Sequence, residues 1–250
     1  PVNRAGVYVQ DLISITAKLK LLAGVRWSLQ QTVPPTTTNL LTGEISKGKR
    51  KVDKAFSPRF GLVYRMKPNV SFFGSYSNSF SINNGLDVFN NVLPASIIDQ
   101  YEVGVKNIFF KGKLTVNLTA YKIVNNNLAQ TAQFDQNGNP NNNSNLKELT
   151  GQTTSNGIEL DVTGHFIKGL SMMAGYSYND MRYTETTGLT GSFIEGDRLV
   201  RTPQHTANLS FFYTVPTGMF KNVSLGAIGN YIGDRVGGWN NQVNPAYPNN

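Results

Sequence analysis

The sequence predicts an all-β protein, an antiparallel transmembrane β-barrel, and three observations support that fold class. Apolar and polar residues alternate with a period of two along most of the chain. Long and short connections alternate between the predicted strands, and aromatic residues gather near both ends of the apolar strand faces. A barrel that crosses a bilayer accounts for all three features, because its strands turn one face to lipid, its loops differ in length on the two sides and its aromatic residues lie at the headgroups.

Composition excludes several other classes of protein. Only 15% of the 250 residues are charged, whereas a soluble domain usually carries roughly 25%. No apolar run reaches the ~18 residues of a transmembrane helix. The chain has no cysteine, which excludes disulfides, thiol catalysis and Cys-ligated metals. The formal net charge of +8 is spread along the chain, so we expect no nucleic-acid partner.

Ten strands are predicted, each with one apolar and one polar face. The clearest covers residues 18–30, where Leu21, Val25 and Trp27 alternate with Lys20 and Arg26. The other nine follow the same rule and cover residues 4–13, 56–66, 70–80, 100–109, 114–120, 158–163, 170–179, 207–214 and 223–231. The sequence gives no convincing helical pattern.

The connections between these strands alternate in length. Short turns are expected at residues 15–17, 67–69, 111–113, 165–169 and 216–222, and long loops at 31–55, 82–97, 126–151 and 184–199. A soluble β-sandwich would explain the period of two but gives no reason for all long loops to lie at one end. In a membrane barrel the long loops are extracellular and the short turns periplasmic. Residues 236–250 have the composition of a further long loop, so we expect an internal part of a larger barrel.

Two rows of aromatic residues are expected on the lipid-facing side, with aliphatic residues between them. The row near the long loops contains Trp27, Phe56, Tyr76, Phe80, Tyr101, Tyr178 and Tyr231, and the row near the short turns contains Tyr64, Phe72, Phe109, Phe211 and Tyr213. The opposite, lumen-facing side carries charges of both signs, which predicts contact with water or with a polar plug. These charges are Lys20, Arg26, Arg59, Arg65, Glu102, Lys106, Glu159 and Asp161.

Eight segments resemble the barrel of TonB-dependent outer-membrane receptors, most of all the ferric-siderophore branch that includes ferrichrome-type receptors. They are 6–13 (GVYVQDLI), 19–27 (LKLLAGVRW), 56–64 (FSPRFGLVY), 101–106 (YEVGVK), 156–164 (NGIELDVTG), 170–178 (LSMMAGYSY), 201–207 (RTPQHTA) and 231–235 (YIGDR). The resemblance implies a 22-stranded barrel in the bacterial outer membrane, closed by an N-terminal plug and energised by the TonB–ExbB–ExbD complex. By the order of these motifs, residues 1–250 would be about the tenth to nineteenth strands. The family's plug, its TonB box and its last three strands have no counterpart here.

The resemblance further implies non-covalent capture of a ferric siderophore by aromatic and basic groups near the extracellular mouth. Iron would then be cargo, and no cofactor or resident metal is expected. The candidates from the residues themselves are Lys47, Lys49, Arg50, Lys51, Lys54, Arg182, Tyr183, Phe193 and Trp239. A cationic loop would attract an anionic chelate, although contact with lipopolysaccharide phosphates or plain solvation would also explain it. Packing within loops or at the bilayer surface would equally explain the three aromatic residues.

Two other classes of function compete with import of a ferric siderophore. Catalysis needs a base near a nucleophile or a pair of carboxylates, but His165 and His205 are expected at opposite ends of the barrel. Glu159 and Asp161 lie on one lumen-facing strand, where pairing with plug cations is the simpler role, so no enzyme is predicted. The alternatives left open are another cargo (cobalamin, haem or an oligosaccharide) and a passive porin.

Overall fold

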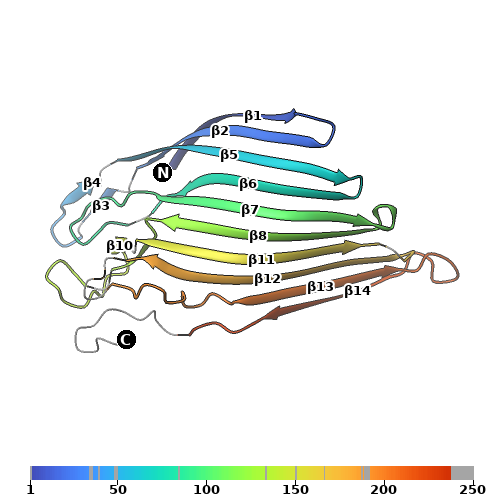
Figure 1. Ribbon diagram of the computed structural model, residues 1–250. Helices are drawn as coiled ribbons and strands as arrows, with labels where there is room; N and C mark the ends of the chain where they lie inside the picture. Colours follow the sequence, from blue (N-terminus) through green and yellow to red (C-terminus); the bar gives the residue numbers. More distant parts are fainter. Residues whose placement is uncertain are drawn as a thin grey trace.

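The computed structural model describes residues 2–237, apart from 34–35, 39, 48–49, 84, 133, 150, 166, 187 and 189–191. Its main feature is a ten-stranded antiparallel sheet in the order β1-β2-β5-β6-β7-β8-β11-β12-β13-β14 (Figure 1). The strands are β1 (Val2–Ser14), β2 (Leu19–Thr32), β5 (Lys51–Lys67), β6 (Val70–Ser81), β7 (Ser96–Phe109), β8 (Leu114–Asn126), β11 (Gln152–Gly164), β12 (Leu170–Glu185), β13 (His205–Thr214) and β14 (Ser224–Ile232). The ten predicted strands and their antiparallel order are thereby confirmed.

Two small hairpins and one short turn of 3-10 helix complete the secondary structure of the described residues. The hairpins are β3 (Thr36–Thr38) with β4 (Ile45–Lys47) and β9 (Ala129–Thr131) with β10 (Lys147–Leu149), and the 3-10 turn covers Phe110–Gly112. Both hairpins lie inside connections that were predicted as loops. No helix in the described part of the chain is long and apolar enough to cross a membrane.

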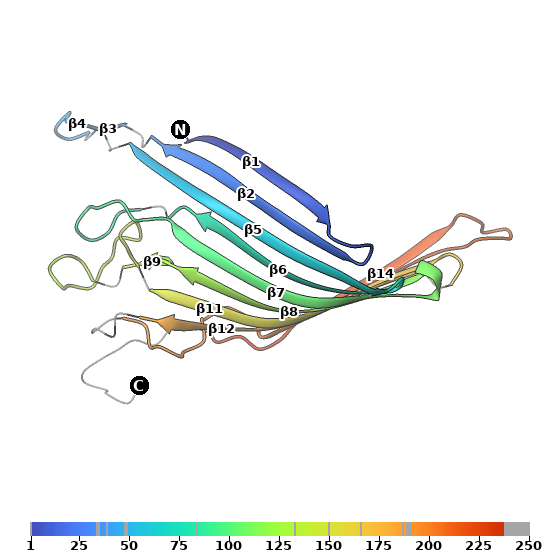
Figure 2. The same cartoon turned by 45° about the horizontal axis from the view of Figure 1, so that its top comes forward.

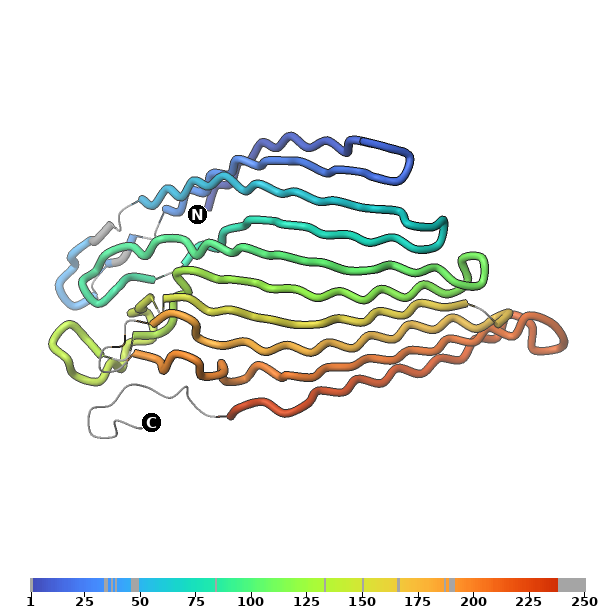
Figure 3. Tube along the Cα trace, viewed as in Figure 1, coloured from blue at the N-terminus to red at the C-terminus, as the bar shows by residue number. Residues whose placement is uncertain are grey.

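All short turns lie at one end of the sheet and all long connections at the other, as the Cα trace shows (Figure 3). Several strands extend further toward the long loops than the apolar pattern predicted: β5 begins at Lys51, β11 begins at Gln152 and β12 ends at Glu185. Their polar ends still pair in the ladder, for example Thr32 with Lys51. Backbone pairing needs no apolar side chains, so the period of two detects only the part of a strand that has one apolar face.

The sheet is curved and open rather than folded around a core (Figure 2). Its accessible surface is 16589 Å², whereas a globular protein of this mass exposes about 11,000 Å². The buried hydrophobic residues among those described are Leu93, Ala132, Tyr183, Phe193 and Leu199, and all of them lie at the long-loop end. The strands therefore bury little apolar surface within this chain, and their apolar face must be covered by something else.

The strand register separates two faces. On the apolar face Leu21 lies opposite Leu62 and Tyr64 opposite Phe72. Phe56, Val103 and Tyr231 on this face are 69%, 63% and 60% exposed, a degree of exposure that is typical of a surface meant for lipid or a partner. On the polar face Arg59 lies opposite Gly24 and Ser77.

Candidate functional site

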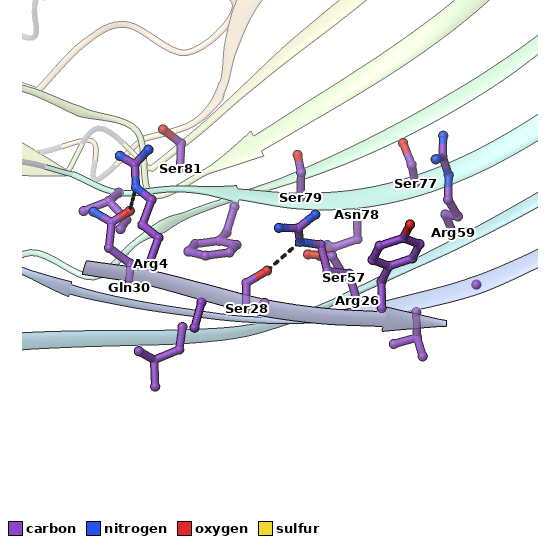
Figure 4. A pocket seen from close by; sticks show the side chains of 18 of the residues that line it. Arg4, Arg26, Ser28, Gln30, Ser57, Arg59, Ser77, Asn78, Ser79 and Ser81 are labelled. Atoms are coloured by element: carbon purple, nitrogen blue, oxygen red, sulfur yellow. Dashed lines mark hydrogen bonds between the residues drawn. The ribbon is translucent and has the colours of Figure 1, made fainter. Parts of the chain in front are cut away.

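A groove of about 900 Å³ lies on the polar face of β1, β2, β5 and β6, and Figure 4 shows it from close by. Its lining reaches Thr32 and Ser81, the last residues of their strands at the long-loop end. Because its wall belongs to the polar face, that face is the hollow side of the sheet.

Small residues create this hollow. A Cβ atom added at Gly6 would come within 3.0 Å of Nη2 of Arg26, and one added at Gly24 within 3.2 Å of the Gln10 side chain. Both glycines therefore leave room for a neighbouring long side chain to lie flat against the sheet. Short hydroxyl side chains line much of the rest of the wall, at Ser28, Ser57, Ser77, Ser79 and Ser81.

Three arginines border the groove and no carboxylate among the described residues neutralises them. Nε of Arg4 donates to Oε1 of Gln30 at 2.7 Å, and Nε of Arg26 donates to Oγ of Ser28 at 3.0 Å. Arg59 has neither a hydrogen bond nor an ion pair to any residue that the structure describes. The terminal nitrogens of the three guanidinium groups have no hydrogen-bond acceptor among the described residues of this chain.

The charges of the whole polar face are divided between its two halves. On β1 to β7, from which we define the basic half-wall, the cations are Arg4, Lys20, Arg26, Lys51, Arg59, Arg65 and Lys106. The two acids there already have partners: Asp53 lies 3.3 Å from Nζ of Lys51, and Glu102 accepts from Ser75 at 3.1 Å and from Gln100. On β8 to β14, the acidic half-wall, Glu159 and Asp161 are the charged residues of this face within the described strands.

The basic loop residues predicted to bind ligand lie outside this groove. Nζ of Lys51 donates to the carbonyl oxygens of Leu93 at 2.8 Å and Asn83 at 3.4 Å, which ties β5 to the β6–β7 loop. Arg50 is exposed beside it. Lys47 belongs to β4 but its side chain, like all of Lys49, lies outside the described residues.

Arg182 lies on the same side of β12 as Tyr178, away from the groove. Its Nε forms an ion pair with Oδ2 of Asp180 at 2.9 Å, and its Nη1 donates to the carbonyl oxygen of Gly196 at 2.8 Å. This arginine holds a loop onto the sheet, and a role in ligand binding stays a prediction.

Tyr183 and Phe193 form the centre of a small core in the loops. Their rings stack with centroids 4.7 Å apart, Leu199 packs against them, and Nε2 of Gln130 donates to the Tyr183 hydroxyl at 2.7 Å. Tyr183 is 0% exposed, so in this conformation the pair stabilises loops rather than presenting rings at the surface. Direct ligand contact by either residue stays a prediction, and Trp239 lies outside the described residues.

The predicted aromatic rows lie on the apolar face and form cross-strand neighbours. Tyr76 and Tyr101 have ring centroids 5.1 Å apart, and Trp27 lies opposite Phe56. Phe80, expected in the same row, has the parity of Tyr76 in β6 and lies opposite Ile97; it also borders the groove. The other members keep the face given by the register: Phe109 opposite Leu114, Tyr178 opposite His205, Phe211 opposite Ala227, Tyr213 opposite Leu225 and Tyr231 opposite Ala207. Contact of these rows with the headgroups stays a prediction.

The two histidines lie far from each other, as predicted. His165 is in the turn after β11, while His205 begins β13 near the long loops and its Nδ1 lies 2.8 Å from the Tyr176 hydroxyl. The described residues contain no cluster of three or more His, Asp or Glu that could hold a metal ion.

Sequence reasoning placed Arg26 and Arg59 on the lumen-facing side but missed Arg4 and the groove. Two signals were available. Serines alternate along 70–81, and the expected register places them beside Arg59. Gly6 and Gly24 lie at strand positions that belong to the polar face. There they open a hollow and do not interrupt the strand.

Comparison with known proteins places this arrangement in a family. Residues 1–248 match the family model described as TonB dependent receptor-like, beta-barrel. The chain is 27% identical over 237 residues to the metal-pseudopaline receptor of Pseudomonas aeruginosa, covering 94% of this chain and 32% of that protein. It is also 27% identical over 236 residues to the ferrichrome outer membrane transporter/phage receptor of Escherichia coli, covering 94% and 29%. The chain thus spans about a third of the length of these relatives.

Solved structures show the same fold. The ferripyoverdine receptor of the P. aeruginosa outer membrane, bound to ferripyoverdine, aligns with a TM-score of 0.70 at 19% identity over 92% of this chain and 28% of that one. The siderophore receptor PiuA of Acinetobacter baumannii aligns with a TM-score of 0.70 at 19% identity over 92% and 33%. Proteins of this family are receptors and transporters rather than enzymes. With its matched range, its ten antiparallel strands and its polar hollow face, the chain belongs to the TonB-dependent receptor β-barrel family.

Proposed function

We propose that the protein containing this chain is a bacterial outer-membrane receptor that captures a ferric siderophore at its extracellular mouth and imports it with energy from the TonB–ExbB–ExbD complex. The observation that carries this proposal is the family match over 1–248. Relatives of this chain are named as receptors for metal-pseudopaline, ferrichrome and ferrioxamine B, which supports a metal chelate as the cargo class.

The geometry supports the same function. The apolar face, exposed in this chain, fits a lipid bilayer, and the opposite face is polar and hollow near the long loops. A wall of this kind lets a water-soluble chelate approach from the loop end, which the lining of the groove reaches. Ferric iron would enter with its chelator as cargo. The exposed cations at the loop end would also contact lipopolysaccharide.

Cobalamin, haem and oligosaccharides remain rival cargoes, and a passive porin remains a rival mechanism, but no feature of the structure favours them. The test is a binding titration of the complete receptor in detergent with ferric hydroxamates, ferric catecholates, cobalamin, haem and an oligosaccharide. We expect saturable submicromolar binding of a ferric chelate. A response only to a different cargo would overturn the iron assignment and keep the receptor fold.

Energy coupling needs a separate measurement. Cells that express the receptor should accumulate radiolabelled iron from the chelate when TonB is present, and should bind but not accumulate it when TonB is deleted. Equal accumulation in both strains would indicate a passive pore.

A further inference from the structure

We propose that the five short turns of the sheet bind the phosphate groups of anionic phospholipids in the membrane leaflet that they face. The turns, taken with the residues that flank them, cover residues 15–18, 66–69, 110–113, 165–169 and 215–223. Their lysines form what we call the lysine rim: Lys18, Lys67, Lys111, Lys113, Lys168 and Lys221. The inference rests on the part of the proposed function that places the barrel in the outer membrane, and it does not depend on the cargo.

The first argument is the uniform charge of the turns. All six lysines of the rim are exposed, and His165 is the other ionisable side chain in the five ranges. The ranges contain no Asp or Glu, although Asp is one of the residues that favour turns. The long connections, by contrast, carry acids at Glu44, Asp87, Asp135, Glu148, Glu195 and Asp197. Turns that needed only solvation would accept both signs of charge, so the uniform charge points to an anionic partner.

The second argument is the apolar side chain that accompanies each lysine. In four of the five turns an apolar residue directly precedes a lysine of the rim. These pairs are Met66–Lys67, Phe110–Lys111, Ile167–Lys168 and Phe220–Lys221, and in the first turn Ile15 precedes Lys18 by three residues. Phe110 and Phe220 are 66% and 62% exposed. An apolar side chain beside a lysine suits the boundary between acyl chains and headgroups, because the lysine stem lies along the apolar region while its ammonium group reaches a phosphate.

The third argument is a β-bulge that brings one lysine to the lipid-facing side. By its number, Lys67 has the parity of Arg65, which lies on the polar face of β5. The ladder shifts register between these two residues, however, and Lys67 pairs with Val70. Val70 has the parity of Phe72 in β6, and paired residues share one face of a sheet. The bulge therefore turns Lys67 to the apolar face, where headgroups rather than lumen water surround the end of the strand.

The fourth argument is the strained backbone of the β7–β8 turn. Phe110 and Lys111 have φ values of 50° and 57°, in the left-handed region that side chains disfavour. The backbone N–H of Lys113 donates to the carbonyl oxygen of Phe110 at 3.3 Å and closes the turn. In this conformation the Phe110 ring is exposed beside two lysines. Backbone strain of this kind occurs where a side chain is presented to a partner.

The spacing of the turns favours a membrane surface over a protein as the partner. All five turns lie along one edge of the sheet (Figures 1 and 3). Since neighbouring strands are ~4.8 Å apart, consecutive turns follow one another about every 10 Å over roughly 40 Å. The β5–β6, β7–β8 and β11–β12 turns each have another of these turns on both sides, so their neighbours in the wall supply no acid. A repeating row of equal charges matches the repeating phosphates of a lipid leaflet.

The experiment uses the complete receptor in detergent, and native mass spectrometry counts the lipids that remain bound as lipid is added. The probes are anionic phosphatidylglycerol and zwitterionic phosphatidylethanolamine with the same acyl chains. The test variants are K111Q/K113Q and the sixfold variant K18Q/K67Q/K111Q/K113Q/K168Q/K221Q. K20Q/K106Q is the matched control, because it removes two exposed lysines of the polar face and the same charge as K111Q/K113Q.

We expect the unmutated receptor to retain phosphatidylglycerol in preference to phosphatidylethanolamine. K111Q/K113Q should weaken the binding of phosphatidylglycerol about tenfold at low ionic strength, and the sixfold variant should bind both lipids equally. K20Q/K106Q should change either affinity less than about twofold. K111R/K113R should bind like the unmutated receptor, because the attraction depends on the charge, and ~1 M salt should reduce the preference.

Equal retention of the two lipids by the unmutated receptor would overturn the inference. An equal loss in K20Q/K106Q would also overturn it, because the charge of the whole protein would then attract the lipid. An equal loss in K111R/K113R, with a lower melting temperature, would mean that these lysines hold the turn. Lysine-dependent binding to anionic peptidoglycan without any lipid preference would assign the rim to a different macromolecule and overturn the inference as well.

Binding of a ferric chelate to the same preparations separates this inference from the proposed cargo. The sixfold variant should bind the chelate like the unmutated receptor, because the lysine rim lies at the opposite end of the sheet from the long loops. A receptor that prefers phosphatidylglycerol but binds no chelate would lose the proposed cargo and keep the lysine rim. A receptor that binds the chelate but shows no lipid preference would lose only the inference.

Discussion

The two halves of the sheet share one scaffold and differ in the chemistry of their hollow face. In the basic half-wall the ring of Phe73 lies over Gly104, and in the acidic half-wall the ring of Tyr121 lies over Gly157. The apolar faces also match, with Leu62 in one half and Leu160 in the other. The charges on the polar face differ between the halves, since its arginines lie in one half and Glu159 and Asp161 in the other.

The apolar face is thus the same in both halves while the polar face differs, which means that the two faces are under different constraints. The bilayer presents the same solvent to every strand, so the apolar face has the same character all along the sheet. The hollow face is not bound by the need to match lipid, so its residues can differ from strand to strand without any cost to the fold. Substitutions that touch the shared scaffold should therefore act equally in both halves, and substitutions of polar-face charges should not.

The largest effect is expected at the glycines under aromatic rings. A Cβ at Gly104 would come within 2.5 Å of the Phe73 ring and 2.6 Å of the Leu118 carbonyl oxygen, and one at Gly157 would overlap the Tyr121 ring. G104A and G157A should each cost about 3 kcal/mol of unfolding free energy through overpacking. Urea titrations of the receptor in lipid vesicles measure this cost. G74A is the control, because a Cβ there has 3.7 Å of space; a loss in only one half would break the claim of a common scaffold.

A smaller effect is expected from the lysine that ties the basic half-wall to its loop. K51M removes the hydrogen bonds to Leu93 and Asn83 and leaves the half-buried Asp53 without its cation. The loss should be about 2 kcal/mol of local stability, seen as faster hydrogen exchange in residues 85–95. K54M alters an exposed lysine of the same strand and should leave that exchange unchanged. Equal exchange in both variants would mean that Lys51 does not hold the loop.

In the acidic half-wall, the small core of Tyr183, Phe193 and Leu199 in the loops depends on the buried hydroxyl group of Tyr183. Y183F keeps the ring stacked on Phe193 but deprives Nε2 of Gln130 of its acceptor at 2.7 Å. About 1 kcal/mol should be lost, and limited proteolysis within residues 192–200 should accelerate roughly fivefold, since cleavage follows the population of opened loops. If cleavage instead slows or stays the same, the hydroxyl contributes nothing to closing the loops.

The smallest effect concerns two similar turns, one in the β6–β7 loop and one in the β8–β11 loop. The side chain and backbone N–H of Asn91 lower the pKa of Asp87, and the backbone N–H groups of Asn139 and Asn137 lower the pKa of Asp135, relative to the ordinary value of 3.8. A lowered pKa in the folded state means that each carboxylate stabilises its turn above pH 3.8 and that this contribution disappears as the pH falls through the lowered pKa.

The amide chemical shift of Phe89 should report the titration of Asp87 and that of Asn139 the titration of Asp135, each with its midpoint below 3.8. D87N should remove the transition at Phe89 alone, because an amide does not titrate there. A transition that persists at Phe89 in this variant would assign it to another group.

The parts of the fold that follow from the bilayer were predictable from the sequence. The alternation of Leu21, Ala23 and Val25 with Lys20 and Arg26 predicted both the strand and its two faces. A strand that crosses a bilayer turns its apolar side chains to lipid, so the pattern of alternation shows which face that is. The extension of β12 to Glu185 was not predictable, because hydrogen bonding to a neighbouring strand leaves no mark in side-chain hydropathy.

The candidate site was predictable only in part. Arg26 and Arg59 were placed on the correct face, but the groove depends on which residues of β1, β2, β5 and β6 lie side by side, and that register became visible only in three dimensions. Tyr183 is an aromatic residue near the expected mouth, so the sequence made it a candidate for ligand binding. Only its contacts with Phe193 and Gln130 show that it packs within the loops.

We expect the polar face of this sheet to be the lumen wall, open to the extracellular side, and the apolar face to lie in lipid. Single cysteines along β6 test it directly, because the chain has no cysteine of its own. In intact cells, cysteines at Ser77 and Ser79 should react with a membrane-impermeant thiol reagent, and spin labels at Phe72 and Gly74 should collide with oxygen dissolved in lipid but not with a water-soluble nickel chelate. Reaction of all four positions with the aqueous reagent, or the opposite alternation, would contradict the account.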